Sequence, residues 1–223
     1  QKMAKENAII KKLKAVESLG CVSVICSDKT GTLTQNKMTV QQVYVDGKVI
    51  NGTDLDITDQ TQRYLLYDAV LTNDSSIVDG KGIGDPTEYA LLEMFRNIHA
   101  LPESYFGKMG IHEDTLRNMM CRIEEVPFDS DRKLMSTKYQ IHGVPTILTK
   151  GAVDVLIDRC VAVRYSDGIH PMTDEEKEKI RRQNQSFSEN GLRVLAFAYK
   201  ESDEVLCTDA ECGYVFLGLI SMV

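Results

Sequence analysis

The chain has 223 residues, 43% of them hydrophobic and 26% charged, and its formal net charge is -7. This composition is typical of a soluble globular protein, and the length allows one large domain or one domain with part of another. The acidic balance argues against a nucleic-acid surface, since phosphate backbones are held by dense Lys and Arg. The longest apolar run, residues 214–223, is shorter than the roughly 20 residues that a membrane helix needs. Six cysteines without a CxxC pair or a histidine cluster argue against a zinc site and fit a reduced compartment.

The N-terminal part is predicted to hold a helix, a strand and the start of an antiparallel sheet. Apolar residues at helical spacing predict a helix over residues 4–19, with Gly20 ending it. The apolar run at residues 21–26 is interpreted as a strand with small buried thiols. Residues 40–45 and 48–50 flank Asp46-Gly47, a dipeptide that suits a tight hairpin turn with positive φ.

Capping residues mark a helix that begins near residue 86. Asp85 is placed as the N-cap, Pro86 as the first helical residue, and Glu88, three residues after the cap, can reach back to it. We expect this helix to run to about residue 99. The glycine-rich stretch before it, at residues 80–84, is interpreted as a loop and not as a dinucleotide site, because it does not give GxGxxG after a strand.

Further helices and strands are expected along the rest of the chain. They are a helix at about 58–71, strands at 134–139 and 146–149 joined through His142-Gly143, a helix at 152–159, a helix capped by Thr173 and closed by Gly191, and strands at 192–199 and 214–220. The last of these is continuously apolar, which is typical of a strand covered on both faces.

The most informative segment is DKTGTLT, residues 28–34, directly after the predicted N-terminal strand. Reacting groups in open α/β sheets lie beyond the carboxyl ends of strands. Asp28 holds such a position, where its carboxylate could attack a γ-phosphate and form an acyl phosphate. Gly31 permits a tight turn and Thr30 can donate to phosphate oxygens. A short match could be an ordinary Asp turn, but the longer string ICSDKTGTLTQN, residues 25–36, favours the functional interpretation.

The string at residues 25–36 resembles the phosphorylation signature of the P-type ATPases, ion pumps that pass the γ-phosphate of ATP to the Asp of such a motif. The resemblance implies that Asp28, Lys29 and Thr30 form the catalytic loop, with Asp28 as the phosphorylated nucleophile and Asp28 and Thr30 beside Mg²⁺. Related phosphatases carry a second Asp where this chain has Thr30. A long-lived aspartyl phosphate is therefore the expected intermediate.

Two further segments resemble the family's nucleotide site. The stretch VPFDSDRK is similar to its adenine-binding stretch, which implies Phe128 as the stacking ring and Lys133 as a neighbour of the nucleotide. The stretch KGA matches a family signature that makes Lys150 and Gly151 pocket residues. Taken alone, the first would be an ordinary polar turn and the second an ordinary loop.

Two more matches follow the same order along the chain. DPTE is similar to the family segment whose Glu lies near the adenine amino group, so Glu88 has a binding role beside its capping role. LRVL matches the segment whose Arg contacts the phosphate chain, here Arg193, although an Arg that opens a strand is usually a surface charge. Together the matches cover nearly the whole chain.

The resemblance implies an α+β nucleotide-binding domain, an antiparallel sheet flanked by helices, inserted in an incomplete haloacid-dehalogenase-like α/β phosphorylation domain. Residues 1–40 would be the N-terminal part of the phosphorylation domain, 41–212 the nucleotide-binding domain, and 213–223 the returning strand of the phosphorylation domain. The family's later magnesium-holding segment, its Thr-Gly-Asp-type phosphate loop and its transmembrane helices do not occur in this sequence. We therefore expect this fragment to bind ATP without turning it over.

The implied whole protein is a cation pump. Residues 3–10 and 16–21 look most like the calcium-transporting branch, with sodium-potassium pumps similar there. The implied partners are ATP, Mg²⁺, a cation carried by a membrane domain outside this chain, and the remaining membrane, actuator and phosphorylation domains, without nucleic acid. This region would be soluble and lie on the cytoplasmic side of a membrane protein. The alternatives are a haloacid-dehalogenase-like phosphatase and a non-catalytic nucleotide-sensing domain.

Overall fold

The computed structural model describes residues 17, 20–27, 37–98 and 112–223. The chain divides into two compact units, residues 1–36 and residues 37–223. The second unit holds strands β1 to β11. The predicted helix at 4–19 falls almost wholly outside the described residues, and the motif at 28–34 lies outside them entirely.

The predicted strand at residues 21–26 is not formed. Residues 20–27 have no strand structure, and Val24 and Ile25 expose 75% and 83% of their surface. Cys21 and Cys26 are exposed as well, where buried thiols were expected. A strand with two apolar faces needs neighbours that pair its backbone and cover its side chains. No strand in the described part of the chain pairs with this segment.

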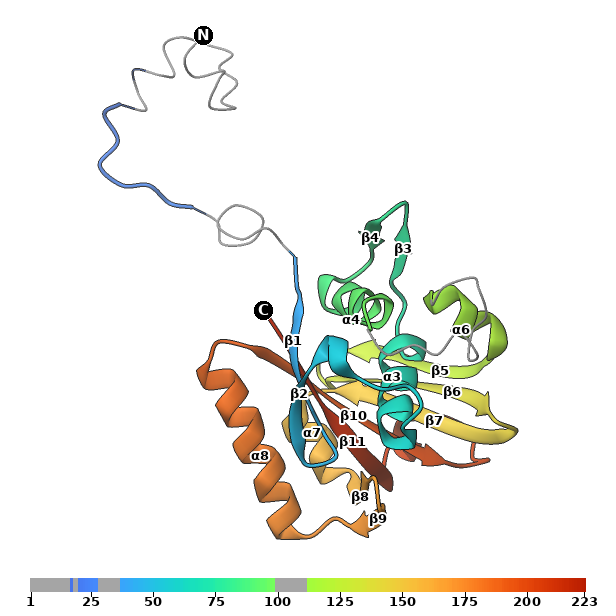
Figure 1. Cartoon of the computed structure of the whole chain (residues 1–223). Coiled ribbons are helices and arrows are strands. Elements are labelled where there is room, and N and C mark those ends of the chain that lie inside the picture. The colour runs from blue at the N-terminus through green and yellow to red at the C-terminus, as the bar shows by residue number, and fades with distance from the viewer. Residues whose placement is uncertain (1–16, 18–19, 28–36, 99–111) are drawn as a thin grey trace. The chain divides into compact units, whose positions relative to one another are not determined.

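A nine-stranded, mostly antiparallel sheet forms the centre of the second unit (Figure 1). Its strands are β1 (Val40–Val45), β2 (Lys48–Asn51), β5 (Arg122–Asp129), β6 (Leu134–Ile141), β7 (Val144–Gly151), β8 (Cys160–Tyr165), β9 (Gly168–Pro171), β10 (Arg193–Glu201) and β11 (Tyr214–Met222). The order is β2-β1-β11-β10-β7-β6-β5, and β8 pairs in parallel with β11 and antiparallel with β9. The predicted antiparallel sheet flanked by helices is confirmed.

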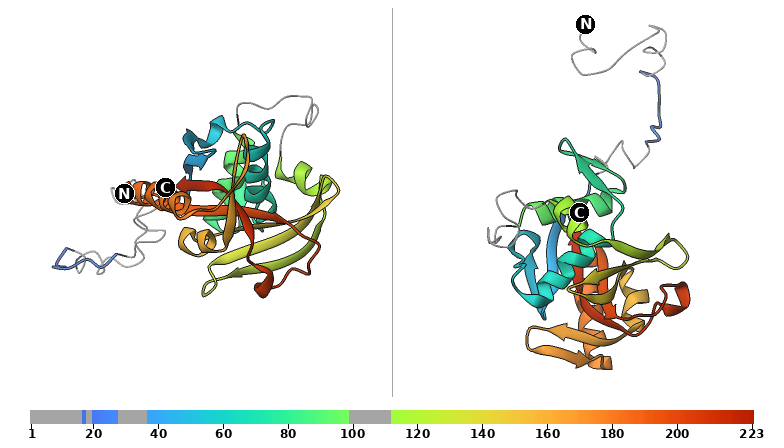
Figure 2. Two further views of the ribbon diagram at one scale, coloured as in Figure 1. Left: turned by 90° about the horizontal axis from the view of Figure 1, so that it is seen from below. Right: turned by 90° about the vertical axis from the view of Figure 1, so that its right-hand side faces the viewer.

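Helices cover both faces of this sheet, as Figure 2 shows. They are α3 (Gln60–Leu71), α4 (Pro86–Arg96), α6 (Glu113–Met119), α7 (Val153–Asp158) and α8 (Asp174–Glu189), with short 3-10 turns η2 (Gly52–Asp54) and η4 (Thr208–Ala210). One core lies under α3, α4 and α6 and includes Leu65, Phe95 and Phe197. A second core lies under α7 and α8 and includes Leu156 and Phe216. Burial of these apolar faces stabilises the sheet from both sides.

The two predicted hairpin turns are confirmed. Asp46 and Gly47 join β1 to β2 with φ values of 53° and 69°. His142 and Gly143 join β6 to β7 with φ values of 49° and 80°. Two consecutive residues with positive φ give the turn twist that matches the twist of paired strands.

The predicted capping residues start their helices, with small shifts at the ends. The Asp85 side chain accepts from the Thr87 amide at 2.8 Å, and α4 ends at Arg96, three residues before the predicted end. Thr173 accepts from the Glu176 amide at the start of α8. The helix predicted from residue 58 begins at Gln60, because Asp59 is its N-cap.

The segment interpreted as a loop between α3 and α4 contains a small hairpin. Strands β3 (Ser76–Val78) and β4 (Lys81–Ile83) pair around Asp79-Gly80, whose φ values are 49° and 74°. The sequence did not indicate these strands, because three residues in a polar stretch are too few to show an alternation of apolar and polar side chains. Strands β5, β8 and β9 and helix α6 were also not predicted.

Residues 213–223 were predicted to be the returning strand of a phosphorylation domain, and this assignment stays a prediction. Strand β11 lies between β1 and β10, with Val40 opposite Met222 and Leu195 opposite Ile220. Both faces of β11 are buried, as its continuous apolar sequence predicts. These faces are covered by the helices of the same unit. The division into a phosphorylation domain and a nucleotide-binding domain likewise stays a prediction.

Candidate functional site

Strand register brings most of the predicted nucleotide-site residues to one end of the sheet. Leu134 at the start of β6 and Ala196 near the start of β10 are both opposite Gly151 at the end of β7. Asp129 at the end of β5 is opposite Leu134. Because antiparallel neighbours begin where the preceding strand ends, five predicted site residues share this end of the sheet: Phe128, Lys133, Lys150, Gly151 and Arg193.

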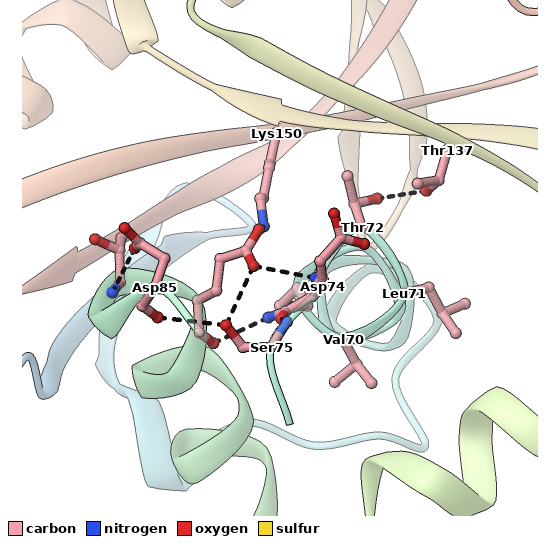
Figure 3. A network of polar contacts seen from close by, with 12 residues as sticks. Val70, Leu71, Thr72, Asp74, Ser75, Asp85, Thr137 and Lys150 are labelled. Carbon is pink, nitrogen blue, oxygen red and sulfur yellow. Dashed lines mark hydrogen bonds and ion pairs between the residues drawn. The ribbon is translucent and has the colours of Figure 1, made fainter. Parts of the chain in front are cut away.

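A buried ion pair joins β7 to the first turn of α4. The Lys150 Nζ lies 2.5 Å from the Glu88 Oε1, and their side chains are 7% and 16% exposed. Burial lowers the pKa of the Lys150 ammonium, and the Glu88 carboxylate opposes this shift. Figure 3 shows Lys150 reaching from its strand toward the helix. The structure therefore brings together two predicted site residues that are 62 positions apart.

The second oxygen of Glu88 is held by the loop that follows α3, whose residues Asp74 and Ser75 are labelled in Figure 3. Glu88 Oε2 accepts from the Asp74 amide at 3.0 Å and from the Ser75 hydroxyl at 3.3 Å. Asn73 donates its side-chain amide to the Glu88 carbonyl at 2.9 Å. Both carboxylate oxygens of Glu88 are thus committed to Lys150 and this loop, and the prediction that Glu88 reaches back to cap its own helix is not what the structure shows.

Two arginines hold the same loop in place, and sequence reasoning missed both. Arg117 and Arg122 donate to backbone carbonyls at the end of α3 and in the loop, those of Val70, Leu71, Asn73 and Ser75. Arg122 also pairs with Asp74 at 2.8 Å. Cations are favourable near the carbonyl end of a helix. The orientation of Glu88 therefore rests on contacts from α6 and β5.

Phe128, near the end of β5, and Lys133, in the tight turn that joins β5 to β6, lie close together in the chain. Phe128 is 61% exposed, and the Lys133 side chain is 54% exposed, 3.8 Å from Asp154. The Asp129 carboxylate accepts from the Asp131 and Arg132 amides at 3.0 and 2.9 Å, and Lys133 has a φ of 57°. An exposed ring beside an exposed cation can bind a flat, anionic ligand by stacking and charge.

Gly151 is required by the close approach of this turn to β7. A Cβ at Gly151 would lie 2.2 Å from the Lys133 carbonyl oxygen, which accepts from the Ala152 amide at 3.1 Å. Gly151→Ala is therefore expected to lower the free energy of unfolding by about 1 to 3 kcal/mol, because backbone must move. Urea unfolding measures this, with Val144→Ala on the same strand as the control. Equal midpoints for the two variants would contradict this prediction.

The surface cavities lie apart from this cluster. Asp28, Lys29 and Thr30 lie outside the described residues. Arg193 is exposed at the start of β10. Two surface cavities, of about 650 and 260 Å³, are lined by other residues, the first around the β8–β9 turn and the second beside α4. The cluster is therefore an open surface with a buried ion pair beneath it.

A buried carboxyl group beside the ion pair was also not predicted. Asp68 on α3 is 0% exposed, and burial raises its pKa to about 7, opposed by Thr72 and by the charge of Lys150. In the described residues, neither carboxylate oxygen of Asp68 has a hydrogen-bond partner that meets the usual geometry. The Thr72 hydroxyl lies 2.9 Å from that of Thr137. In the sequence, the signal for this buried carboxyl group was a single Asp among the apolar residues of the predicted helix.

The described residues contain no group of three or more His, Cys, Asp and Glu side chains arranged to hold a metal ion. Among the same residues, no helix combines the length and the apolar character needed to span a membrane.

Fold and site together define an α+β domain whose sheet end gathers three cations, an exposed aromatic ring and a glycine. Residues 61–223 match the family model described as "P-type ATPase, cytoplasmic domain N", and the chain belongs to the P-type ATPase family. The resemblance seen in the sequence is thereby confirmed.

Similar proteins extend well beyond this chain. It is 44% identical over 228 residues to "Calcium-transporting ATPase 1" of Lactococcus lactis and 42% identical over 225 residues to "Calcium-transporting ATPase 1" of Bacillus cereus, with 100% of this chain and 24% of each relative covered. "Calcium-transporting ATPase 1" of Saccharomyces cerevisiae is 33% identical over 247 residues, with 99% of this chain and 25% of the relative covered. The chain thus spans about a quarter of the length of these curated relatives.

Proposed function

We propose that this chain is the ATP-binding region of a cation-transporting P-type ATPase, most like the calcium-transporting branch. The observation that carries the proposal is the convergence of Phe128, Lys133 and Lys150 at one end of the sheet in a member of this family. The names of the relatives support calcium as the transported cation.

Each residue of the cluster has a role that its surroundings suit. The adenine ring stacks on the exposed face of Phe128. Lys133 and Arg193, both exposed, meet the phosphate chain. The Lys150–Glu88 pair forms the floor of the site and holds fixed charges beneath the base. Gly151 keeps the backbone free of a side chain where strand and turn approach each other.

Phosphoryl transfer belongs to the whole pump in this proposal. Asp28 attacks the γ-phosphorus of ATP, so that an aspartyl oxygen–phosphorus bond forms while the bond to ADP breaks. Lys29 and Thr30 flank the nucleophile, and Asp28 and Thr30 would hold Mg²⁺, which supplies charge neutralisation. Residues 1–40 belong to a haloacid-dehalogenase-like phosphorylation domain, on the cytoplasmic side of a membrane protein whose membrane domain carries the cation. The 223-residue chain binds ATP without turnover.

Calorimetric titration of the 223-residue chain with ATP tests the binding role. We expect saturable binding that Phe128→Ala and Lys133→Ala each weaken on the order of tenfold, since base stacking and a phosphate contact are each worth about 1 to 3 kcal/mol. Both side chains are largely exposed, so neither change should alter the fold. The matched controls are Ile123→Ala, an exposed residue of the same strand, and Lys48→Ala, an exposed lysine of the β1–β2 hairpin.

The controls decide how the titration is interpreted. Loss of affinity in the two site variants with unchanged affinity in the two controls places the nucleotide at this end of the sheet. A folded wild-type chain that shows no heat of binding would refute the proposed function. Equal loss of ATP affinity in the two site variants and the two control variants would show that ATP binds elsewhere or without specificity.

A further inference from the structure

We propose that Glu211 is a positioning residue for nucleotide binding: from the opposite face of the sheet, it fixes the turn that carries Phe128 and Lys133 by holding Arg132. The effect on binding rests on the proposed function, whereas the effect on the turn does not. Glu211 follows η4, far along the chain from the turn, and belongs to none of the matched nucleotide-site segments.

The turn needs an anchor because its two functional side chains supply none. Phe128 and Lys133 are mostly exposed, so packing of their own atoms does not set their direction. Their position follows from the backbone of residues 129–133, which includes one residue with positive φ, Lys133. Whatever fixes this backbone therefore fixes where the ring and the cation point.

Arg132 is the side chain that ties the turn together. Its guanidinium donates to the Leu134 carbonyl at 2.9 Å and to the Pro127 carbonyl, which closes the end of β5 against the start of β6. The same group lies 3.3 Å from the Glu211 Oε1 and is 12% exposed. A planar guanidinium can donate to the two carbonyls and the Glu211 carboxylate at once, because its donors form a rigid fork.

Glu211 holds this guanidinium from the α7 side of the sheet. Its side chain is 0% exposed, and its Oε1 accepts from the Ser136 hydroxyl at 2.5 Å. Ser136 comes two residues after Leu134 on β6, so both side chains point to the same face of the sheet, where Leu134 packs in the α7 core. Tyr139 points to the other face, toward the α3 core. Glu211 and the Lys150–Glu88 pair therefore act on the nucleotide cluster from opposite faces.

The segment that carries Glu211 is itself held. Arg159 donates to the Glu211 carbonyl at 2.8 Å, and Lys200 donates to the Ala210 carbonyl at 2.6 Å. A carboxylate buried to this degree is unfavourable without a cation. If Arg132 turned away, Glu211 would lose its paired cation, so the turn is kept in one conformation. Such preorganisation lowers the entropy lost when a ligand binds.

Glu211→Gln tests the inference, because the amide retains the shape and can still accept from Ser136 but carries no charge for Arg132. We expect ATP affinity by calorimetry to fall about tenfold, the size of one lost charge-assisted hydrogen bond. The matched control is Glu124→Gln, which removes the charge paired with Lys138 at 3.4 Å and keeps an oxygen that can accept from the Leu206 amide, now at 2.8 Å. Glu124 lies on β5 yet is not a partner of Arg132. The ATP affinity of Glu124→Gln should stay at the wild-type value.

Amide hydrogen exchange provides a second test, which measures the stability of the turn without any ligand. The Asp131 and Arg132 amides, which donate to Asp129, should exchange faster in Glu211→Gln and not in Glu124→Gln. Arg132→Gln should weaken binding at least as much as Glu211→Gln, because it also removes the donors to the Leu134 and Pro127 carbonyls. The double variant should bind ATP no more weakly than Arg132→Gln, since Glu211 acts through Arg132.

The outcomes separate the two proposals. Wild-type exchange rates and affinity in Glu211→Gln would overturn the inference. Absence of ATP binding by the wild-type chain would refute the proposed function, while exchange of the turn amides would still decide the inference. If Glu211→Gln does not fold, Arg132→Lys replaces it, because lysine keeps a charge near Glu211 without the fork that reaches both carbonyls. Unchanged exchange in that variant would also overturn the inference.

Discussion

Raising the pH from 5 to 8 is expected to lower the free energy of unfolding by about 2 to 3 kcal/mol through one carboxyl group, Asp68. Burial raises its pKa from 3.8 to about 7 in the folded chain. Below the unfolded value the group is protonated in both states. Between that value and pH 7 only the unfolded state ionises, so this contribution to stability is lost as pH rises through the folded pKa.

Asp68→Asn should remove this pH dependence, because an amide of the same shape does not titrate. Urea unfolding at several pH values, followed by circular dichroism, compares it with the wild type and with Asp154→Asn, whose carboxylate is 73% exposed. We expect Asp68→Asn to be more stable than the wild type at pH 8. Parallel pH profiles for the wild type and Asp68→Asn would show that Asp68 is not the group responsible.

Removal of Lys150 is expected to destabilise the fold by about 3 kcal/mol or more, because breaking a buried ion pair leaves an uncompensated charge. Lys150→Met fills a similar volume but deprives the Glu88 carboxylate of its partner at 2.5 Å. It also removes the positive charge that lowers the pKa of Asp68. The fall of stability with pH should therefore extend to higher pH in this variant.

Glu88→Gln should cost less than Lys150→Met, because the Asp74 carboxylate and the ionised fraction of Asp68 still act on the Lys150 charge. The double variant Glu88→Gln, Lys150→Met should be less destabilised than the sum of the two single variants, since it leaves neither partner charged. Chemical denaturation of all four proteins at pH 7 measures this coupling. Additive losses would mean that the contact contributes little to stability.

The sequence alone determined the family and those local elements that carry clear turn or capping residues. Hairpin turns at Asp46-Gly47 and His142-Gly143 and helix caps at Asp85 and Thr173 were predictable, because each depends on a few neighbouring residues and their backbone preferences. The apolar continuity of β11 predicted burial on both faces. The phosphorylation string indicated the family, although its residues lie outside the described part of the chain.

The tertiary structure decided which distant segments meet, and no local pattern contains that information. The pairing of β11 with β1 and β10 placed residues 213–223 in the same unit as the helices that cover them. Glu88 met Lys150 across 62 positions, and Glu211 met Ser136 across 75. Side-chain partners of buried charges are chosen by packing and desolvation of the whole fold. For the same reason, the exposure of residues 21–26 could not be inferred from their apolar sequence.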